Sequence, residues 1–201
     1  MTRHEPDFDR VASFGALVAA ARRAARGHRS SAEVADFLLK LEPEVLQLER
    51  ELRAGDYRPR PYRTFEIREP KPRTISAAAF RDRVVHHALC AEVEPVLERG
   101  AVESSFACRR GKGVMSAIAH VQRLARRHPY ALKLDVRHFF ETLSHAVLER
   151  LLARRVRDER VRWLYGVFID AGAPGSEPGR GLPIGNLTSQ HFANRYLSPV
   201  D

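Results

Sequence analysis

The feature that most constrains the fold is a change of hydrophobic period at Gly55. Before it lies one apolar stripe at helical spacing: Val34, Phe37, Leu38, Leu41, Val45, Leu48 and Leu52. This stripe predicts an amphipathic helix that Pro43 breaks or restarts and that Gly55 ends. After Gly55, residues 57–76 alternate polar and apolar around "REPKP", which predicts a β-hairpin with a proline-stiffened turn.

Most other segments have helical patterns. Helices are expected over residues 14–27, 78–98, 114–128, 144–156 and 159–170, with loops at 104–113 and 171–181. "YALKLDV", residues 130–136, alternates Tyr130, Leu132 and Leu134 inward and predicts a short strand that ends near Asp135. The fold class expected is α+β, rich in helix, with a few antiparallel strands and too few of them for a complete sheet.

The charge is strongly basic and unevenly distributed. Lys and Arg number 34 against 25 acids, for a net charge of +9. The 31 residues from Ser104 to Leu134 contain no Asp or Glu, and the acid that ends this basic stretch is Asp135. A long stretch of one charge sign is typical of a surface that binds a polyanion such as nucleic acid. Arginine-rich composition alone has a second explanation, a GC-rich genome.

Several protein classes are excluded or disfavoured. No apolar run reaches the 18 or more residues that a membrane span requires. The N-terminus "MTRHEPDFDR" is too polar for a signal peptide. Cys90 and Cys108 have no metal-ligand spacing and are weak support for a disulfide framework. We therefore expect a reduced, cytoplasmic protein that does not bind a membrane.

Two short segments offer polar groups for chemistry. In "LKLDVRHFF", a carboxylate at a strand end followed by two aromatic residues suggests a metal ligand beside a shaped wall, although an aspartate there also caps turns. Lys71 and Arg73 of "KPR" are suited to a triphosphate, or are simply a solvated turn tip. His86 and His87 point about 100° apart on a helix, which favours a core or surface role over shared metal binding.

Four stretches together resemble the motifs of reverse transcriptases in order and spacing. They are "FRDRVVHHAL", "SFACRRGKG", "LKLDVRHFFETLSH" and "GLPIGNLTSQHFANRYLSPVD". The resemblance covers about residues 50–201 and is closest to the reverse transcriptases of diversity-generating retroelements. It implies a right-hand polymerase, with two Mg²⁺ ions in the complete enzyme, that copies an RNA template from a DNA or RNA primer with dNTPs.

The resemblance also implies individual roles. Asp135 matches the first metal-binding aspartate of the palm, and the carbonyl of Val136 would be a second metal contact near the nucleotide. Phe140 matches the aromatic gate that excludes a ribonucleotide 2′-OH, whereas Phe139 is expected in the core. Lys71 and Arg73 would meet the triphosphate. Arg109, Arg110 and Lys112 would follow the template backbone.

The closing motif would underlie the templating base pair. Gly185 would be small because the nucleotide stacks on its backbone, and Gln190 would lie near the nucleotide, while Asn186 and Ser189 would contact nucleic acid. Ile184 stands where most reverse transcriptases have Gln, as in the error-prone retroelement enzymes. Because Ile cannot donate a hydrogen bond there, we expect looser control of the nascent pair.

The resemblance divides the chain into an N-terminal helical region (1–56), fingers (57–130 and 144–182) and a partial palm (131–143 and 183–201). The second catalytic motif, an aromatic residue followed by X-Asp-Asp, and the thumb are not in the sequence. We therefore expect these 201 residues alone to be inactive. A small basic accessory protein is a further implied partner.

Two alternatives remain open from the sequence. One is a non-catalytic nucleic-acid-binding protein that keeps the basic fingers and lacks the chemistry. The other is a reverse transcriptase of the group II intron or defence-associated type, which shares the chemistry but not the biology.

Overall fold

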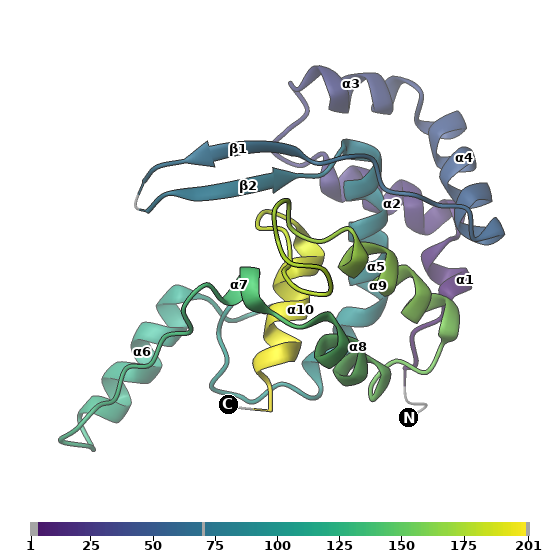
Figure 1. Cartoon of the computed structure of the whole chain (residues 1–201). Helices are drawn as coiled ribbons and strands as arrows, with labels where there is room; N and C mark the ends of the chain where they lie inside the picture. The colour runs from purple at the N-terminus through teal and green to yellow at the C-terminus, as the bar shows by residue number, and fades with distance from the viewer. Residues whose placement is uncertain (1–3, 70, 200–201) are drawn as a thin grey trace.

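The computed structural model describes residues 4–69 and 71–199, and within them it is rich in helix with one two-stranded antiparallel sheet (Figure 1). The elements, in chain order, are α1 Phe8–Val11, α2 Phe14–Ala24, α3 Ala32–Leu39, α4 Leu41–Ala54, β1 Arg63–Ile67, β2 Arg73–Ala77, α5 Phe80–Glu98, α6 Val114–Ala125, α7 Phe139–Thr142, α8 His145–Ala153, α9 Glu159–Asp170 and α10 Leu187–Leu197. The expected helices and the hairpin are thus present. Pro70 of the expected turn and residues 200–201 of the expected palm segment lie outside the described residues.

Helix α5 is the centre of the molecule. It packs against α2 on one side and α10 on another, and α1 and α3 also contact it. Val84, Leu89 and Val93 of this helix are fully buried. A helix that is covered on several sides needs apolar residues around most of its circumference, which explains why α5 shows no single clean apolar stripe.

The helix ends follow local sequence signals. Gly55 adopts a left-handed conformation, with φ of 76°, and closes α4. This backbone geometry is accessible to glycine at little cost. Pro43 lies in the first turn of α4, where a proline removes no helical hydrogen bond, so the expected helix is divided between Leu39 and Leu41.

A buried polar network joins the start of the hairpin to α5. The Tyr57 hydroxyl donates to Asp82 Oδ1 at 2.7 Å, and the Arg60 backbone N–H donates to Asp82 Oδ2 at 2.9 Å. Burial raises the pKa of Asp82, and these two hydrogen bonds oppose that rise. Arg81 pairs instead with Glu51 at 2.6 Å. The "RDR" segment is therefore structural in large part, and it fixes the base of the hairpin.

The expected strand at residues 130–136 is wrong. This segment has no regular secondary structure, and Tyr130, Leu132 and Leu134 are 91%, 83% and 82% exposed. An alternating pattern forms a strand only when a neighbouring strand accepts its hydrogen bonds. The part of the chain that the structure describes places no strand beside this segment, so its side chains do not point inward.

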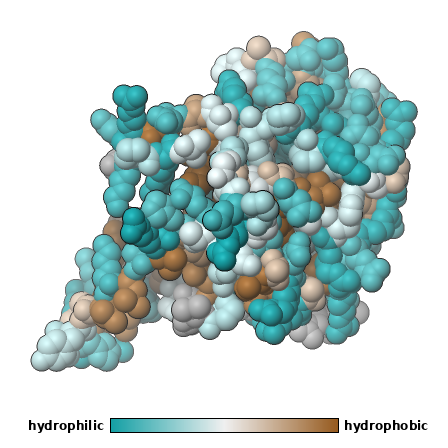
Figure 2. Space-filling view, viewed as in Figure 1, coloured by the Kyte–Doolittle hydropathy of each residue, from teal (hydrophilic) through white to brown (hydrophobic). Residues whose placement is uncertain are grey.

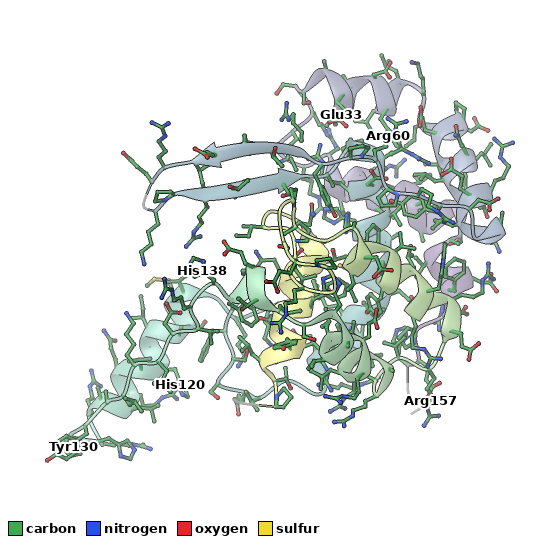
Figure 3. All side chains as sticks on the ribbon, viewed as in Figure 1. Glu33, Arg60, His120, Tyr130, His138 and Arg157 are labelled. Atoms are coloured by element: carbon green, nitrogen blue, oxygen red, sulfur yellow. The ribbon has the colours of Figure 1, made fainter. Side chains whose placement is uncertain are left out.

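Helix α6 and the segment after it form an arm that extends from the body on the same side as the hairpin (Figure 1). Val114, Met115, Ile118 and Val121 of α6 are exposed apolar residues. Figure 2 shows apolar surface along this arm, and Figure 3 places Tyr130 at its tip. Among the described helices, none is both long and apolar enough to cross a membrane.

Candidate nucleotide and nucleic-acid site

A cleft of about 460 Å³ lies where the hairpin, α7 and the loop between α9 and α10 meet. Arg73, Thr74 and Ser76 of β2 line one side, and Leu182 and Ile184 of the loop line another. The sequence singled out Arg73 and Ile184 separately, and the fold brings them to one cleft.

The hairpin is joined to this loop by one hydrogen bond and one close packing contact. The Ser76 N–H donates to the Ile184 carbonyl at 2.8 Å. At Gly185, a Cβ would lie 2.8 Å from Cγ2 of Ile75, and the backbone φ is +116°. A side chain at Gly185 would therefore meet both steric overlap and backbone strain. In the structure, the small size of this residue serves the approach of β2.

The other side of the loop is fixed to α7 and α8. The Leu182 N–H donates to the Phe140 carbonyl at 2.7 Å, and the Gly181 N–H donates to the Leu143 carbonyl at 2.9 Å. His145 Nε2 lies 2.7 Å from the Gly181 carbonyl oxygen. The loop is thus held between β2 on one side and α7 and α8 on the other. Hydrogen bonds on both sides therefore fix the position of its backbone.

Phe140 is half-buried and packs against the core, with its ring 5.4 Å from that of Phe139 in an edge-to-face arrangement. Phe139 is also half-buried and contacts Tyr196, in agreement with its expected core position. Phe140 does not itself line the cleft, but its neighbour Glu141 does. The role of Phe140 as a gate for the 2′-OH stays a prediction.

Carboxylates in the cleft were missed from the sequence. Glu66, Glu141 and Glu177 line it together with a single cation, Arg73. Lys71 is exposed near the hairpin tip and is not part of the lining. No local sequence signal marks the three glutamates, because tertiary folding alone brings β1, α7 and the loop together. The three carboxylates repel a triphosphate that carries no bound cation, and Arg73 is the single cation of the lining. The phosphates of a nucleotide would therefore have to lie toward Arg73 and Lys71.

The described residues do not form a magnesium site. Across residues 4–69 and 71–199, no three His, Cys, Asp or Glu side chains come together as ligands for a metal ion. Asp135 and Val136 are exposed, and neither lines the cleft. An isolated aspartate supplies too few oxygen ligands for Mg²⁺, and no catalytic step through Mg²⁺ can be derived from this arrangement.

In the basic loop at residues 104–113, protein groups already bind two of the three cations singled out from the sequence. Arg109 pairs with Glu98 at 2.9 Å and donates to the carbonyls of Val102 and Ser105. Its guanidinium group therefore braces the loop. Arg110 is exposed, and Lys112 donates to the Glu103 carbonyl at 2.7 Å. Arg110 is the member of this set best placed to meet a phosphate.

Helix α10 holds that loop from one face. Asn194 Nδ2 donates to the Ala107 carbonyl at 2.7 Å, and the Cys108 thiol donates to Gln190 Oε1. Gln190 is thus placed beside the basic loop. Asn186 and Ser189, expected to contact nucleic acid, are buried.

The histidine pair is not a metal site. His86 is buried, stacks on Phe168 with ring centroids 4.0 Å apart, and has Nδ1 2.9 Å from the Thr188 hydroxyl. Burial lowers the pKa of His86 to about 3, so the ring is neutral at pH 7. Burial also lowers the pKa of His87. The expected core role of this pair is correct for His86.

Replacing Gly185 with Ala tests the contact between the hairpin and the loop. We expect Gly185→Ala to lower the free energy of unfolding, measured in urea, by about 1–3 kcal/mol more than Gly175→Ala. Gly175 is the matched control because its φ is also positive, at +83°, and nothing lies within 4 Å of its Cβ position.

Truncating the facing side chain by Ile75→Ala is expected to relieve part of the Gly185→Ala effect, because it removes Cγ2 of Ile75, the atom that the new Cβ meets. The double variant should then be more stable than the sum of the two single effects indicates. Additive effects, or equal losses for Gly185→Ala and Gly175→Ala, would contradict the contact.

The curated proteins that this chain resembles in sequence are longer than the chain itself. No family model matches it. Protein YkfC of Escherichia coli (strain K12) is 29% identical over 176 residues, which are 81% of this chain and 45% of YkfC. The group II intron-encoded protein LtrA of Lactococcus lactis subsp. cremoris is 23% identical over 167 residues, which are 80% of this chain and 28% of LtrA. This chain thus spans less than half of either relative.

A solved structure shares the fold. A chain of a partial Cas6-RT-Cas1–Cas2 complex superposes with a TM-score of 0.58 at 16% sequence identity, covering 100% of this chain and 35% of that chain. At this identity the likeness concerns the fold. Together, the comparisons show that the chain has distant sequence similarity to group II intron-encoded proteins and shares a fold with a chain of an RT-containing complex.

Proposed function

We propose that this chain is the fingers and first part of the palm of an RNA-directed DNA polymerase. Residues 57–130 and 144–182 would be the fingers, and residues 131–143 and 183–201 the palm, behind an N-terminal helical region. The fold shared with a chain of an RT-containing complex and the distant homology to group II intron-encoded proteins support this proposal.

The observation that carries the proposal is the docking of β2 on the loop at residues 182–185. A hairpin cation, Arg73, and the backbone at Ile184 and Gly185 are brought together by the Ser76–Ile184 hydrogen bond. A nucleotide needs a cation for its phosphates and a flat surface for its base. The cleft offers Arg73 for the first and the loop backbone for the second.

The basic loop would guide the RNA template. Arg110 is exposed there, while Arg109 and Asn194 bind loop carbonyls and Gln190 binds the Cys108 thiol. A preordered loop loses less conformational entropy on binding than a free chain does. Figure 1 shows the loop leading into the α6 arm, on the side of the molecule from which the hairpin also extends.

Chemistry would need groups beyond those assembled in the described residues. We propose that the chain binds template, primer and dNTPs but does not join nucleotides by itself, because the described residues bring no group of metal-ligating side chains together at Asp135. The complete enzyme would hold two Mg²⁺ ions with Asp135 and further carboxylates. By resemblance alone, we propose a small basic accessory protein as a further partner.

RNA binding tests this function. We expect the purified chain to bind single-stranded RNA with an affinity that falls about tenfold between 50 and 200 mM salt, as three or so phosphate contacts require. Arg110→Gln should weaken binding and reduce the salt slope by about one phosphate contact. Arg157→Gln is the control, since Arg157 is exposed and lies away from the α6 arm (Figure 3).

The same preparation should add no nucleotides to a primed RNA template. Affinity that is insensitive to salt, or equal losses for Arg110→Gln and Arg157→Gln, would contradict the proposed template path. Template-dependent synthesis would refute the proposal that these residues alone lack a complete catalytic centre.

We further propose low fidelity, as in diversity-generating retroelements. This rests on Ile184, a half-buried side chain in the cleft that cannot hydrogen-bond a nucleotide. The relatives found by comparison include intron-encoded proteins and a chain of an RT-containing Cas complex, so the group II or defence-type alternative has support of its own.

In a polymerase that contains these 201 residues and synthesises DNA, Ile184→Gln should lower misincorporation opposite template adenine, because the amide can restrain the nascent pair. Ile184→Leu is the matched control and should leave the error rate unchanged. Sequencing of the cDNA measures both rates. An unchanged rate in Ile184→Gln would eliminate this explanation of fidelity.

A further inference from the structure

A second pocket, of about 300 Å³, lies between α2, α5 and the start of α10. We define it as the cationic pocket, and its lining residues are Arg23, Ala24, Arg26, His28, Arg83, His86, His87, Gly185, Asn186 and Leu187. We propose that the cationic pocket binds a phosphate monoester, such as the 5′-terminal phosphate of a nucleic-acid strand. This function is separate from polymerase chemistry and does not depend on it.

The charge of the lining matches a dianion. Three arginines line the pocket, and no carboxylate does. Glu33 reaches Arg83 from outside the lining, at 3.8 Å. The three arginines together with this one carboxylate carry a net charge of +2. A phosphate monoester carries about −1.5 to −2 at pH 7, whereas each backbone diester carries one charge.

Three buried nitrogen atoms of the pocket's lining residues have no hydrogen-bond acceptor among the described residues. Arg83 Nε, His86 Nε2 and Asn186 Nδ2 are buried nitrogen atoms, and none has a hydrogen-bond partner among the described residues. His86 and Asn186 are 2% and 4% exposed. A buried donor without a partner destabilises the fold, so an oxyanion in this pocket would remove an existing cost.

Two of these donors need a closer account. The neutral His86 ring carries its proton on Nε2 when Nδ1 accepts from the Thr188 hydroxyl, 2.9 Å away. Burial, and after it Asp82, raises the pKa of Tyr62, a side-chain contact from Asn186 opposes the rise, and the net pKa is about 12. No hydrogen bond of good geometry joins Asn186 Nδ2 to Tyr62.

Helix α10 begins at the pocket. Asn186 is its N-cap residue, and its side chain makes no capping hydrogen bond. The first backbone N–H groups of a helix have no partners within the helix, and its N-terminus carries partial positive charge, which favours an anion. Here the helix end coincides with the three arginines and the buried donors, so all three features favour the same kind of ligand.

The arginines of the pocket also act on His87, another residue of the lining. The pKa of His87 is lowered first by burial and then by Arg23, Arg83 and Arg26. These are the three arginines of the lining. Their positive charges therefore act at the His87 ring, in the direction that also favours an anion in the pocket.

The test compares two single-stranded oligonucleotides that differ only in a 5′-phosphate or a 5′-hydroxyl, by fluorescence anisotropy with the intact chain. We expect the 5′-phosphate to bind about tenfold more tightly, the gain typical of one additional charge-assisted contact. Inorganic phosphate, at ionic strength matched with chloride, separates the sources of the ligand. If inorganic phosphate abolishes the preference for the 5′-phosphate oligonucleotide, the pocket binds a free phosphate group. If this preference persists in the presence of inorganic phosphate, the pocket binds the strand end.

Variants on one helix supply the control. Arg23→Met should reduce the preference for the 5′-phosphate to near onefold, and Arg22→Met should keep it, because Arg22 is exposed and does not line the pocket. Arg26→Met is a second exposed test position, and thermal unfolding checks that each variant is folded. Equal affinities for the two oligonucleotides, without stabilisation by phosphate over matched chloride, would overturn the proposal. Equal losses in Arg22→Met and Arg23→Met would do so as well.

Discussion

The candidate site depends on one hydrogen bond, from the Ser76 N–H to the Ile184 carbonyl. It connects the edge of the only sheet in the described residues to a loop that α7 and α8 hold from the other side. Gly185 permits this bond, because a Cβ there would overlap Ile75. Without this close approach, Arg73 and the loop backbone would not share a cleft, and the hairpin would be attached to the body mainly through the Tyr57–Asp82 network.

Helix α10 connects three separate features of the molecule. The loop before it lines the cleft through Ile184, and its N-terminal end lines the cationic pocket through Asn186 and Leu187. Farther along, Gln190 and Asn194 hold the basic loop. Successive residues of one chain segment therefore face different surfaces. A small movement of α10 against α5 would change all three, which makes its packing on that helix a functional constraint as well as a stabilising one.

Helix periodicity was sufficient to predict the longer helices, because each helix satisfies its own backbone hydrogen bonds, but the four-residue helices α1 and α7 were not predicted. The strand at residues 130–136 could not be predicted in this way, since a strand requires a partner and the described residues provide none. The acid-free stretch correctly indicated a basic loop, but the spacing of charges could not show that Arg109 pairs with Glu98 while Arg110 stays exposed. The cleft glutamates and the cationic pocket were missed because tertiary packing of distant elements creates them.

The most direct test of the central claim is hydrogen–deuterium exchange of the chain with and without a primed RNA template and a dNTP. If β2 and the loop form one nucleotide-binding surface, exchange should slow at residues 73–76 and 182–187 together, with further slowing at the basic loop. The groove between α8 and α9, which lies apart from the cleft, should be unchanged. Protection confined to that groove, or no protection at residues 73–76 and 182–187, would contradict the account.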